Sequence, residues 1–159
     1  MMHNWFTCKI RFEKTLENGM NKKVTELYLV DALSFTEAES RIIEEMTPFI
    51  SGEFEVSGVA KANYNELFPS EEESACIWYK CKLWFMTLDE KTGAEKRTAS
   101  NVLVQASDLR DAIKKLDEGM KYTLADYVIA SVSGTAIMDV YPYEADPDVK
   151  PEFNDADRR

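Results

Sequence analysis

Two rows of aromatic and basic side chains are the residues of this chain whose types and spacing could do chemistry. They alternate along two expected β-strands, so each row shares one side of its strand. The candidate binding residues are Trp5, Lys9, Arg11, Trp78, Lys80, Lys82 and Trp84. Such a pattern is typical of a surface that contacts single-stranded nucleic acid, because bases stack on the rings while the cations follow the phosphates.

Other uses of the same residues stay open. The Trp rings could fill a junction between two sheets, with the Lys stems lying along its edge. The face could instead bind a protein partner, as an inhibitor or an assembly factor does, or a small ligand in a pocket between two halves of the chain. The sequence contains no glycine-rich aromatic motif of the RNA-recognition type, which counts against nucleic acid.

Catalytic and metal-binding patterns are scarce, so the sequence favours a non-enzymatic binding protein with no cofactor. His3 is the single histidine and lies near an expected loose end, which removes most histidine-based metal sites and Ser-His or Cys-His nucleophiles. The acidic residues at 44–45 and 71–73 fall on an expected helix surface and in an expected linker, where they are solvated charge. We find no phosphate-binding loop, HExxH motif, paired CxxC motif or nucleophile elbow.

The composition indicates an acidic globular protein with a net charge of −10. Much of that charge lies in the linker and after residue 143, so a local basic face is compatible with it. There is neither a long apolar run nor a signal peptide, and we expect a cytoplasmic protein that does not contact a membrane. The three cysteines have no paired spacing, and we expect Cys8 and Cys81 to be buried thiols.

An internal repeat indicates which elements position the candidate residues. The stretch WFTCKIRF at 5–12 returns 73 residues later as WYKCKLWF at 78–85. Trp and Cys are rare residues, so chance is a poor explanation for their return at matching places. The side of each strand opposite to the candidate residues is apolar and should face the core; it consists of Phe6, Cys8, Ile10, Phe12, Tyr79, Cys81, Leu83 and Phe85.

Each copy of the repeat is followed by the signals of a hairpin. Turn residues at 17–19 and 91–93 include a glycine and lead to returning strands at 22–30 and 96–104. A helix then follows in each half, as the next signals show.

The two expected helices have N-terminal caps and one apolar side. Ser34 and Glu37 form a capping box, and apolar residues recur at helical spacing up to Pro48. Ser107 or Asp108 caps the second helix, which has the same spacing of apolar residues.

A third strand is expected to close each half, over residues 54–68 and 127–141. Ser57-Gly58 and Ser133-Gly134 are predicted to be bulges or bends within these strands. A right-handed crossover would place each third strand beside the first, which gives the strand order 2-1-3.

We therefore predict an α+β protein of two tandem ββαβ repeats related by a pseudo-twofold axis, with one helix per half on one face of an antiparallel sheet. The halves should pack together, because three strands and one helix bury little alone. The predicted boundaries are a first repeat at 1–69, an acidic linker at 70–77, a second repeat at 78–143 and a disordered tail at 144–159. Exposed sheet edges are compatible with a homodimer.

The segments KVTELYLVDALSFTEAE at 23–39 and PFISGEF at 48–54, together with Trp5-Phe6-x-Cys8-Lys9, resemble an uncharacterised domain-of-unknown-function family. This family consists of short proteins of gut Bacteroidota and crAss-like phages, and the likeness covers roughly residues 4–143. The resemblance implies a cytoplasmic bacterial or phage protein and brings no catalytic residues. A phage or mobile-element setting would favour an accessory role on nucleic acid or an interaction with a host protein.

Overall fold

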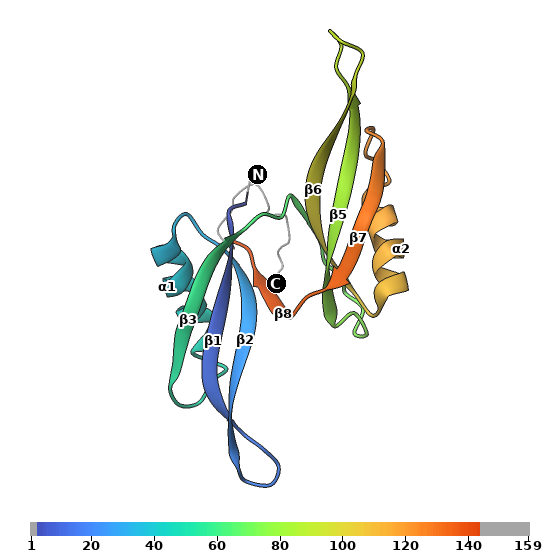
Figure 1. Ribbon diagram of the computed structural model, residues 1–159. Helices are drawn as coiled ribbons and strands as arrows, with labels where there is room; N and C mark the ends of the chain where they lie inside the picture. Colours follow the sequence, from blue (N-terminus) through green and yellow to red (C-terminus); the bar gives the residue numbers. More distant parts are fainter. Residues whose placement is uncertain (1–2, 144–159) are drawn as a thin grey trace, which may run out of the picture. The chain divides into compact units, whose positions relative to one another are not determined.

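The computed structural model describes residues 3–143, which form an α+β fold of two four-stranded sheets and two helices (Figure 1). The chain divides into two compact units. Unit 1 runs to Ala62 and resumes at Asp139, and unit 2 comprises Asn63–Met138. The predicted tail at 144–159 lies outside the described residues. Within the described part of the chain, no helix has the length and apolar character needed to cross a membrane.

Unit 1 is a four-stranded sheet with one helix. Its elements are β1 (Trp5–Thr15), β2 (Asn21–Asp31), α1 (Phe35–Met46), β3 (Phe54–Ala62) and β8 (Ile137–Tyr141). The strand order is β3-β1-β2-β8, and β1 is antiparallel to both β2 and β3. The order 2-1-3 that we expected for the first three strands is therefore present, with β1 in an interior position.

Unit 2 repeats this arrangement of elements. They are β4 (Glu66–Phe68), β5 (Ile77–Leu88), β6 (Glu95–Ala106), α2 (Leu109–Gly119) and β7 (Tyr127–Gly134). The strand order is β4-β6-β5-β7, and β5 is antiparallel to both β6 and β7. The aromatic strand of the sequence repeat is again interior, which explains why it is the most apolar strand of its sheet.

The prediction of one long third strand in each half was wrong. Residues 54–68 form β3 and β4, separated at 63–65, and residues 127–141 form β7 and β8, separated at 135–136. The second piece of each pair joins the other sheet: β4 lies parallel to β6, and β8 is the neighbour of β2. Alternating side chains mark both pieces as extended, but they do not reveal a change of sheet, because that depends on which edge is open.

The first unit also ends earlier than we expected from the sequence. The chain leaves unit 1 after Ala62, before the predicted boundary at residue 69, and the expected linker at 70–77 lies within unit 2. Each sheet consequently contains four strands, where the repeat alone predicted three.

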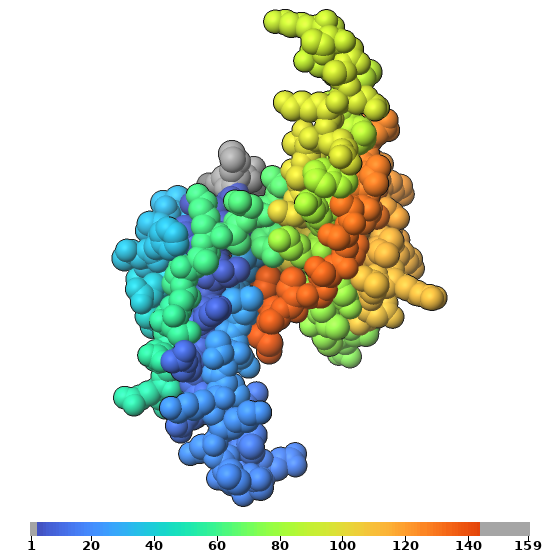
Figure 2. All heavy atoms as spheres, in the orientation of Figure 1, coloured from blue at the N-terminus to red at the C-terminus, as the bar shows by residue number. Residues whose placement is uncertain are grey.

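Both hairpin turns have the glycine geometry that their sequences predicted. Gly19 and Gly93 have φ angles of 83° and 72°, which other residues rarely adopt. Figure 2 shows the hairpin ends, coloured blue at residues 13–23 and yellow-green at 86–97, projecting from the rest of their own units.

The apolar faces of β1 and β5 pack against the helices, as predicted. In unit 1 the core joins residues of β1 and β2 to the α1 residues Ala38, Ile42 and Met46. In unit 2 the equivalent core includes Leu116 and Met120 from the α2 side. The helix caps are also confirmed, since Ser34 Oγ accepts the Glu37 N–H at 3.1 Å and Asp108 Oδ1 accepts the Asp111 N–H at 2.8 Å.

A bulge interrupts the third strand of each unit, but the two predicted positions were not equally good. Ser57 is the extra residue between the pairs Lys9–Gly58 and Ile10–Val56, which confirms the first prediction. In unit 2 the extra residue is Ala130, not Ser133 or Gly134, where β7 ends. Ala130 lies 73 residues after Ser57, so the repeat offset locates the bulge better than the Ser-Gly pair does.

Candidate nucleic-acid interface

Trp84 is the one candidate Trp ring that stays partly exposed, and two cations lie over it. The ring stands on β5, on the sheet face turned away from the unit 2 core. Lys82 Nζ is 4.6 Å from the ring centroid, and the Arg97 guanidinium carbon is 5.1 Å from it. Lys82 lies two residues away on the same strand, and Arg97 reaches the ring diagonally from β6, because Trp84 is paired with the small Ala99.

Lys80 extends this group of cations along β5. Lys80, Lys82 and Arg97 form no ion pair within 4.0 Å among the described residues. An exposed cation–π contact is worth about 0.5–1 kcal/mol, so the ring gathers positive charge without neutralising it. In a protein of net charge −10, we name these residues, with Trp84, the Trp84 patch.

The other two Trp rings do not belong to an open surface. Trp5 is 2% exposed and Trp78 is 4% exposed. The His3 ring stacks on Trp5 with a centroid distance of 5.0 Å, and the Trp78 carbonyl accepts a hydrogen bond from the Thr135 side chain at 2.8 Å. Burial removes both rings from contact with a solution ligand, and we leave them out of the proposed surface.

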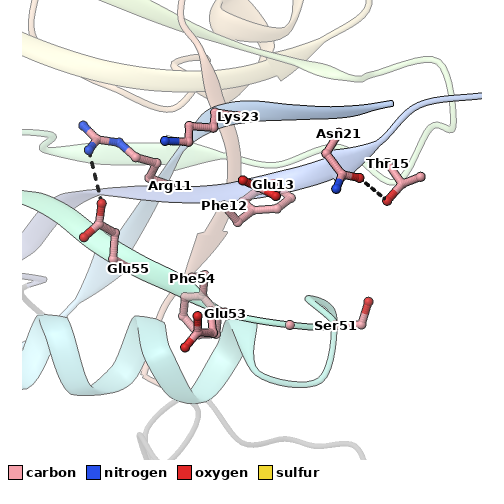
Figure 3. Close-up of a pocket in the computed structure, with 11 residues that line it drawn as sticks. Arg11, Phe12, Glu13, Thr15, Asn21, Lys23, Ser51, Glu53, Phe54 and Glu55 are labelled. Atoms are coloured by element: carbon pink, nitrogen blue, oxygen red, sulfur yellow. Dashed lines mark hydrogen bonds and ion pairs between the residues drawn. The ribbon is translucent and has the colours of Figure 1, made fainter. Parts of the chain in front are cut away.

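The candidate cations of unit 1 lie in a different environment. Lys9 is exposed, but Arg11 donates to Glu55 across the β1–β3 pair at 3.1 Å, which satisfies its charge (Figure 3). Arg11 also lines a hollow of about 700 Å³ with acidic and basic walls. The other lining residues are Phe12, Glu13, Thr15, Asn21, Lys23, Ser51, Gly52, Glu53, Phe54 and Glu55. The mixture of charges and the ion pair give this hollow no preference for an anion.

His3 is better anchored than its sequence position suggested. Its Nδ1 lies 2.5 Å from Oδ2 of Asp31, and Oδ1 of the same carboxylate accepts the Asn4 N–H at 3.0 Å. Asp31 is 3% exposed, so these two contacts satisfy a buried carboxylate. The pairing of Trp5 with Asp31 across β1 and β2 is what brings the histidine to it. The sequence signal was an Asp at the end of an apolar strand.

The buried thiols have no activated nucleophile among them. Cys8 and Cys81 are buried and free, as predicted, while Cys76 is free and exposed. Burial raises the pKa of the Cys8 and Cys81 thiols to about 11, so both remain protonated near neutral pH.

Arg97 is the member of the patch that the sequence analysis did not select. The Gly93 turn and the register that follows from it place Arg97 diagonally opposite Trp84. Counting back from that turn would have found it, because a hairpin turn determines which residues face each other.

A model of a family described as a domain of unknown function, DUF4494, matches residues 4–143. The chain belongs to the DUF4494 family. The family match includes the strands of both units and the Trp84 patch, and its description assigns no activity. No curated protein and no solved structure matches this DUF4494 chain.

Proposed function

We propose that this protein binds single-stranded nucleic acid through the Trp84 patch and catalyses no reaction. The observation that carries the proposal is the partly exposed Trp84 ring beside cations that have no ion-pair partner among the described residues. A flat aromatic ring matches a base, and the neighbouring cations match the phosphates of the strand. Positive charge gathered on one sheet face of an acidic chain also repels other acidic surfaces less than it attracts a polyanion.

The geometry constrains how a base would bind. Lys82 and Arg97 already lie over the Trp84 ring, so a base must displace one of them or stack on the Arg97 guanidinium plane, which also stacks on bases. A displaced cation would then lie within reach of the adjacent phosphate. One stacked base contributes about 1–3 kcal/mol, so this patch predicts modest affinity from a short strand.

Fluorescence anisotropy of labelled single-stranded oligonucleotides tests the proposal. The Trp84→Ala/Lys82→Ala double variant should weaken binding by at least about 5–150-fold, which is the worth of one stacked base. Binding by the unchanged protein should fall as salt rises, with a logarithmic slope of about −2 for three cations on a single strand.

The matched control is Lys9→Ala/Arg11→Ala, which removes the equivalent cations of unit 1. It should leave oligonucleotide affinity within about twofold, because Arg11 is already paired with Glu55. Binding that is absent, or that does not depend on salt, would remove the proposal. Equal losses in both double variants would show a diffuse electrostatic contact in place of a defined patch.

A protein-interaction role is the second candidate, favoured by the outer side of α2. Leu109 and Ile113 lie one helical turn apart and are 48% and 37% exposed, although the sequence pattern placed both on the core side. Phe35, at the start of α1, is 55% exposed. A pull-down should then recover one stoichiometric partner that is lost with Leu109→Lys/Ile113→Lys, while the Trp84→Ala/Lys82→Ala variant retains it.

The proposal includes the finer architecture and setting. We infer a duplicated ββαβ unit with a pseudo-twofold relation between its copies, supported by the 73-residue repeat and by the bulges at Ser57 and Ala130. A cytoplasmic location and a bacterial or phage origin accompany it, as the family resemblance implies. An experimental structure in which the two units failed to superpose would remove the duplication.

A further inference from the structure

Each sheet is completed by a strand that arrives from the other unit's part of the chain. β4 follows β3 by three residues, 63–65, and becomes the edge strand beside β6. β8 follows β7 by two residues, 135–136, and becomes the edge strand beside β2. We call the place beside β2 the β8 slot.

The β8 slot of unit 1 holds its strand mainly through the residues at the end of that strand. Arg41 of α1 donates to the carbonyls of Tyr141 and Pro142 at 3.4 and 3.2 Å, and its guanidinium carbon lies 4.7 Å from the centroid of the Tyr143 ring. The Tyr143 hydroxyl donates to Glu37, and the Tyr141 ring lies 6.0 Å from the Tyr28 ring. The recognised features are therefore a Tyr-Pro-Tyr end and its backbone carbonyls.

Unit 2 holds β4 with the same type of pair. Lys115 of α2 donates to Ser70 Oγ at 3.0 Å and pairs with Asp111 at 3.0 Å. Phe68 packs so closely against the end of α2 that a Cβ on Gly119 would lie 2.8 Å from its ring. In both units an acid and a base four residues apart on the helix hold the segment that follows an aromatic residue and a proline.

The acid of each pair has a second role, which connects the slot to the helix. Glu37 accepts the Leu33 N–H at 2.6 Å, and Asp111 accepts the Ser107 N–H at 3.0 Å. Each acid therefore stabilises the start of its helix as well as the strand end. All these contacts are made to the strand and the residues after it, and none of them involves the connections at 63–65 or 135–136.

We infer that the β8 slot accepts β8 of a second copy of this chain, which gives a strand-exchanged dimer. Every contact described above forms equally well in trans, because the donated segment carries its own recognition features. Strand exchange of this kind is a low-cost route to a dimer, and short connections promote it by straining the closed monomer. The connection of two residues before β8 is the shorter of the two connections.

Refolding the full chain at two concentrations tests the inference. Refolding near 1 mM competes with the effective concentration that a short connection imposes on β8, whereas refolding near 10 µM does not. Size-exclusion chromatography with light scattering should then show a dimer only after concentrated refolding, and this dimer should persist for hours after dilution. Deleting Ala136 should shift the population toward dimer, and inserting two glycines after Ala136 should shift it back to monomer.

The clamp variants distinguish strand exchange from an ordinary surface dimer. Arg41→Ala should speed relaxation of the diluted dimer to monomer by about tenfold or more, because opening breaks charge-assisted bonds that Arg41 makes in both forms. Lys115→Ala is the matched control and should leave the rate within about twofold, since it holds β4 only. Absence of dimer after concentrated refolding, or a relaxation rate that Arg41→Ala leaves unchanged, would overturn the inference even if the Ala136 deletion fails to fold.

Discussion

The interior strands β1 and β5 have the same sequence pattern, yet their outer faces differ at one pair of equivalent positions. Arg11 and Trp84 lie 73 residues apart, and their neighbours on the third strand are Glu55 and Val128. In unit 1 this pair forms an ion pair at 3.1 Å. In unit 2 the apolar neighbour leaves Trp84 with Lys82 and Arg97. The comparison teaches that a single cross-strand pair decides the surface chemistry on a shared backbone.

The core sides of the same two strands are alike, and this similarity gives the largest expected effects. Ile10→Ala and Leu83→Ala each remove a fully buried side chain from the centre of a sheet. Each should lower the free energy of unfolding by about 2–5 kcal/mol, measured by urea denaturation. Exposed Thr15→Ala is the control and should cost less than about 0.5 kcal/mol. A loss confined to one of the two buried sites would contradict the similarity of the two cores.

Exchanging the pair that distinguishes the outer faces should transfer their chemistry. Trp84→Arg/Val128→Glu installs the unit 1 ion pair in unit 2 and should weaken oligonucleotide binding by about 5–150-fold, measured by anisotropy. Arg11→Trp/Glu55→Val makes the reverse change beside Lys9 and should strengthen binding. If both exchanged variants bound like the unchanged protein, the patch would not reside at this pair.

Breaking the unit 1 ion pair should have a small effect. Arg11 and Glu55 have about half of their side-chain surfaces exposed, at 54% and 62%, and exposed pairs contribute about 0.2–1 kcal/mol. A double-mutant cycle with Arg11→Ala and Glu55→Ala should measure a coupling in that range, which declines as salt rises. A coupling above about 2 kcal/mol would show that the hollow around Arg11 excludes water.

The smallest effect concerns alkaline pH and should distinguish unit 1 from unit 2. Burial, with the neighbouring Glu37, raises the pKa of Tyr143 to about 12, and burial likewise raises the pKa of Tyr141 to about 12. An unfolded Tyr has a pKa near 10. Their contribution to stability is therefore complete below pH 10 and declines as pH rises from 10 through 12. Tyr143→Phe should flatten this decline in urea denaturation midpoints, whereas Tyr122→Phe, an exposed control, should not.

Much of the fold could be predicted because its signals are local. Hairpin turns at Gly19 and Gly93, the caps Ser34 and Asp108 and the alternation along β1 depend on neighbouring residues, and the structure has all of them. The exchange of β4 and β8 was missed because edge pairing depends on which sheet has an open edge, and that is a property of the assembled chain. A three-residue strand such as β4 carries too few side chains to specify its partner.

The candidate site could be predicted only in part, for a related reason. Alternation correctly placed Trp5, Trp78 and Trp84 on the side of their strands away from the helices. It could not distinguish the buried Trp5 and Trp78 from the partly exposed Trp84, because alternation describes the direction of a side chain and not what covers it. Arg97 was missed for the same reason, since its contact with Trp84 crosses strands.

The order of residues alone determined the strands, the helices and the 73-residue repeat, because periodicity, capping and turn chemistry act within a few residues. Tertiary structure decided which strand completes each sheet, that Asp31 holds His3, and that Arg11 is neutralised while Lys82 and Arg97 gather at Trp84. These outcomes depend on pairing between distant segments, whose energies are compared only when the chain has folded.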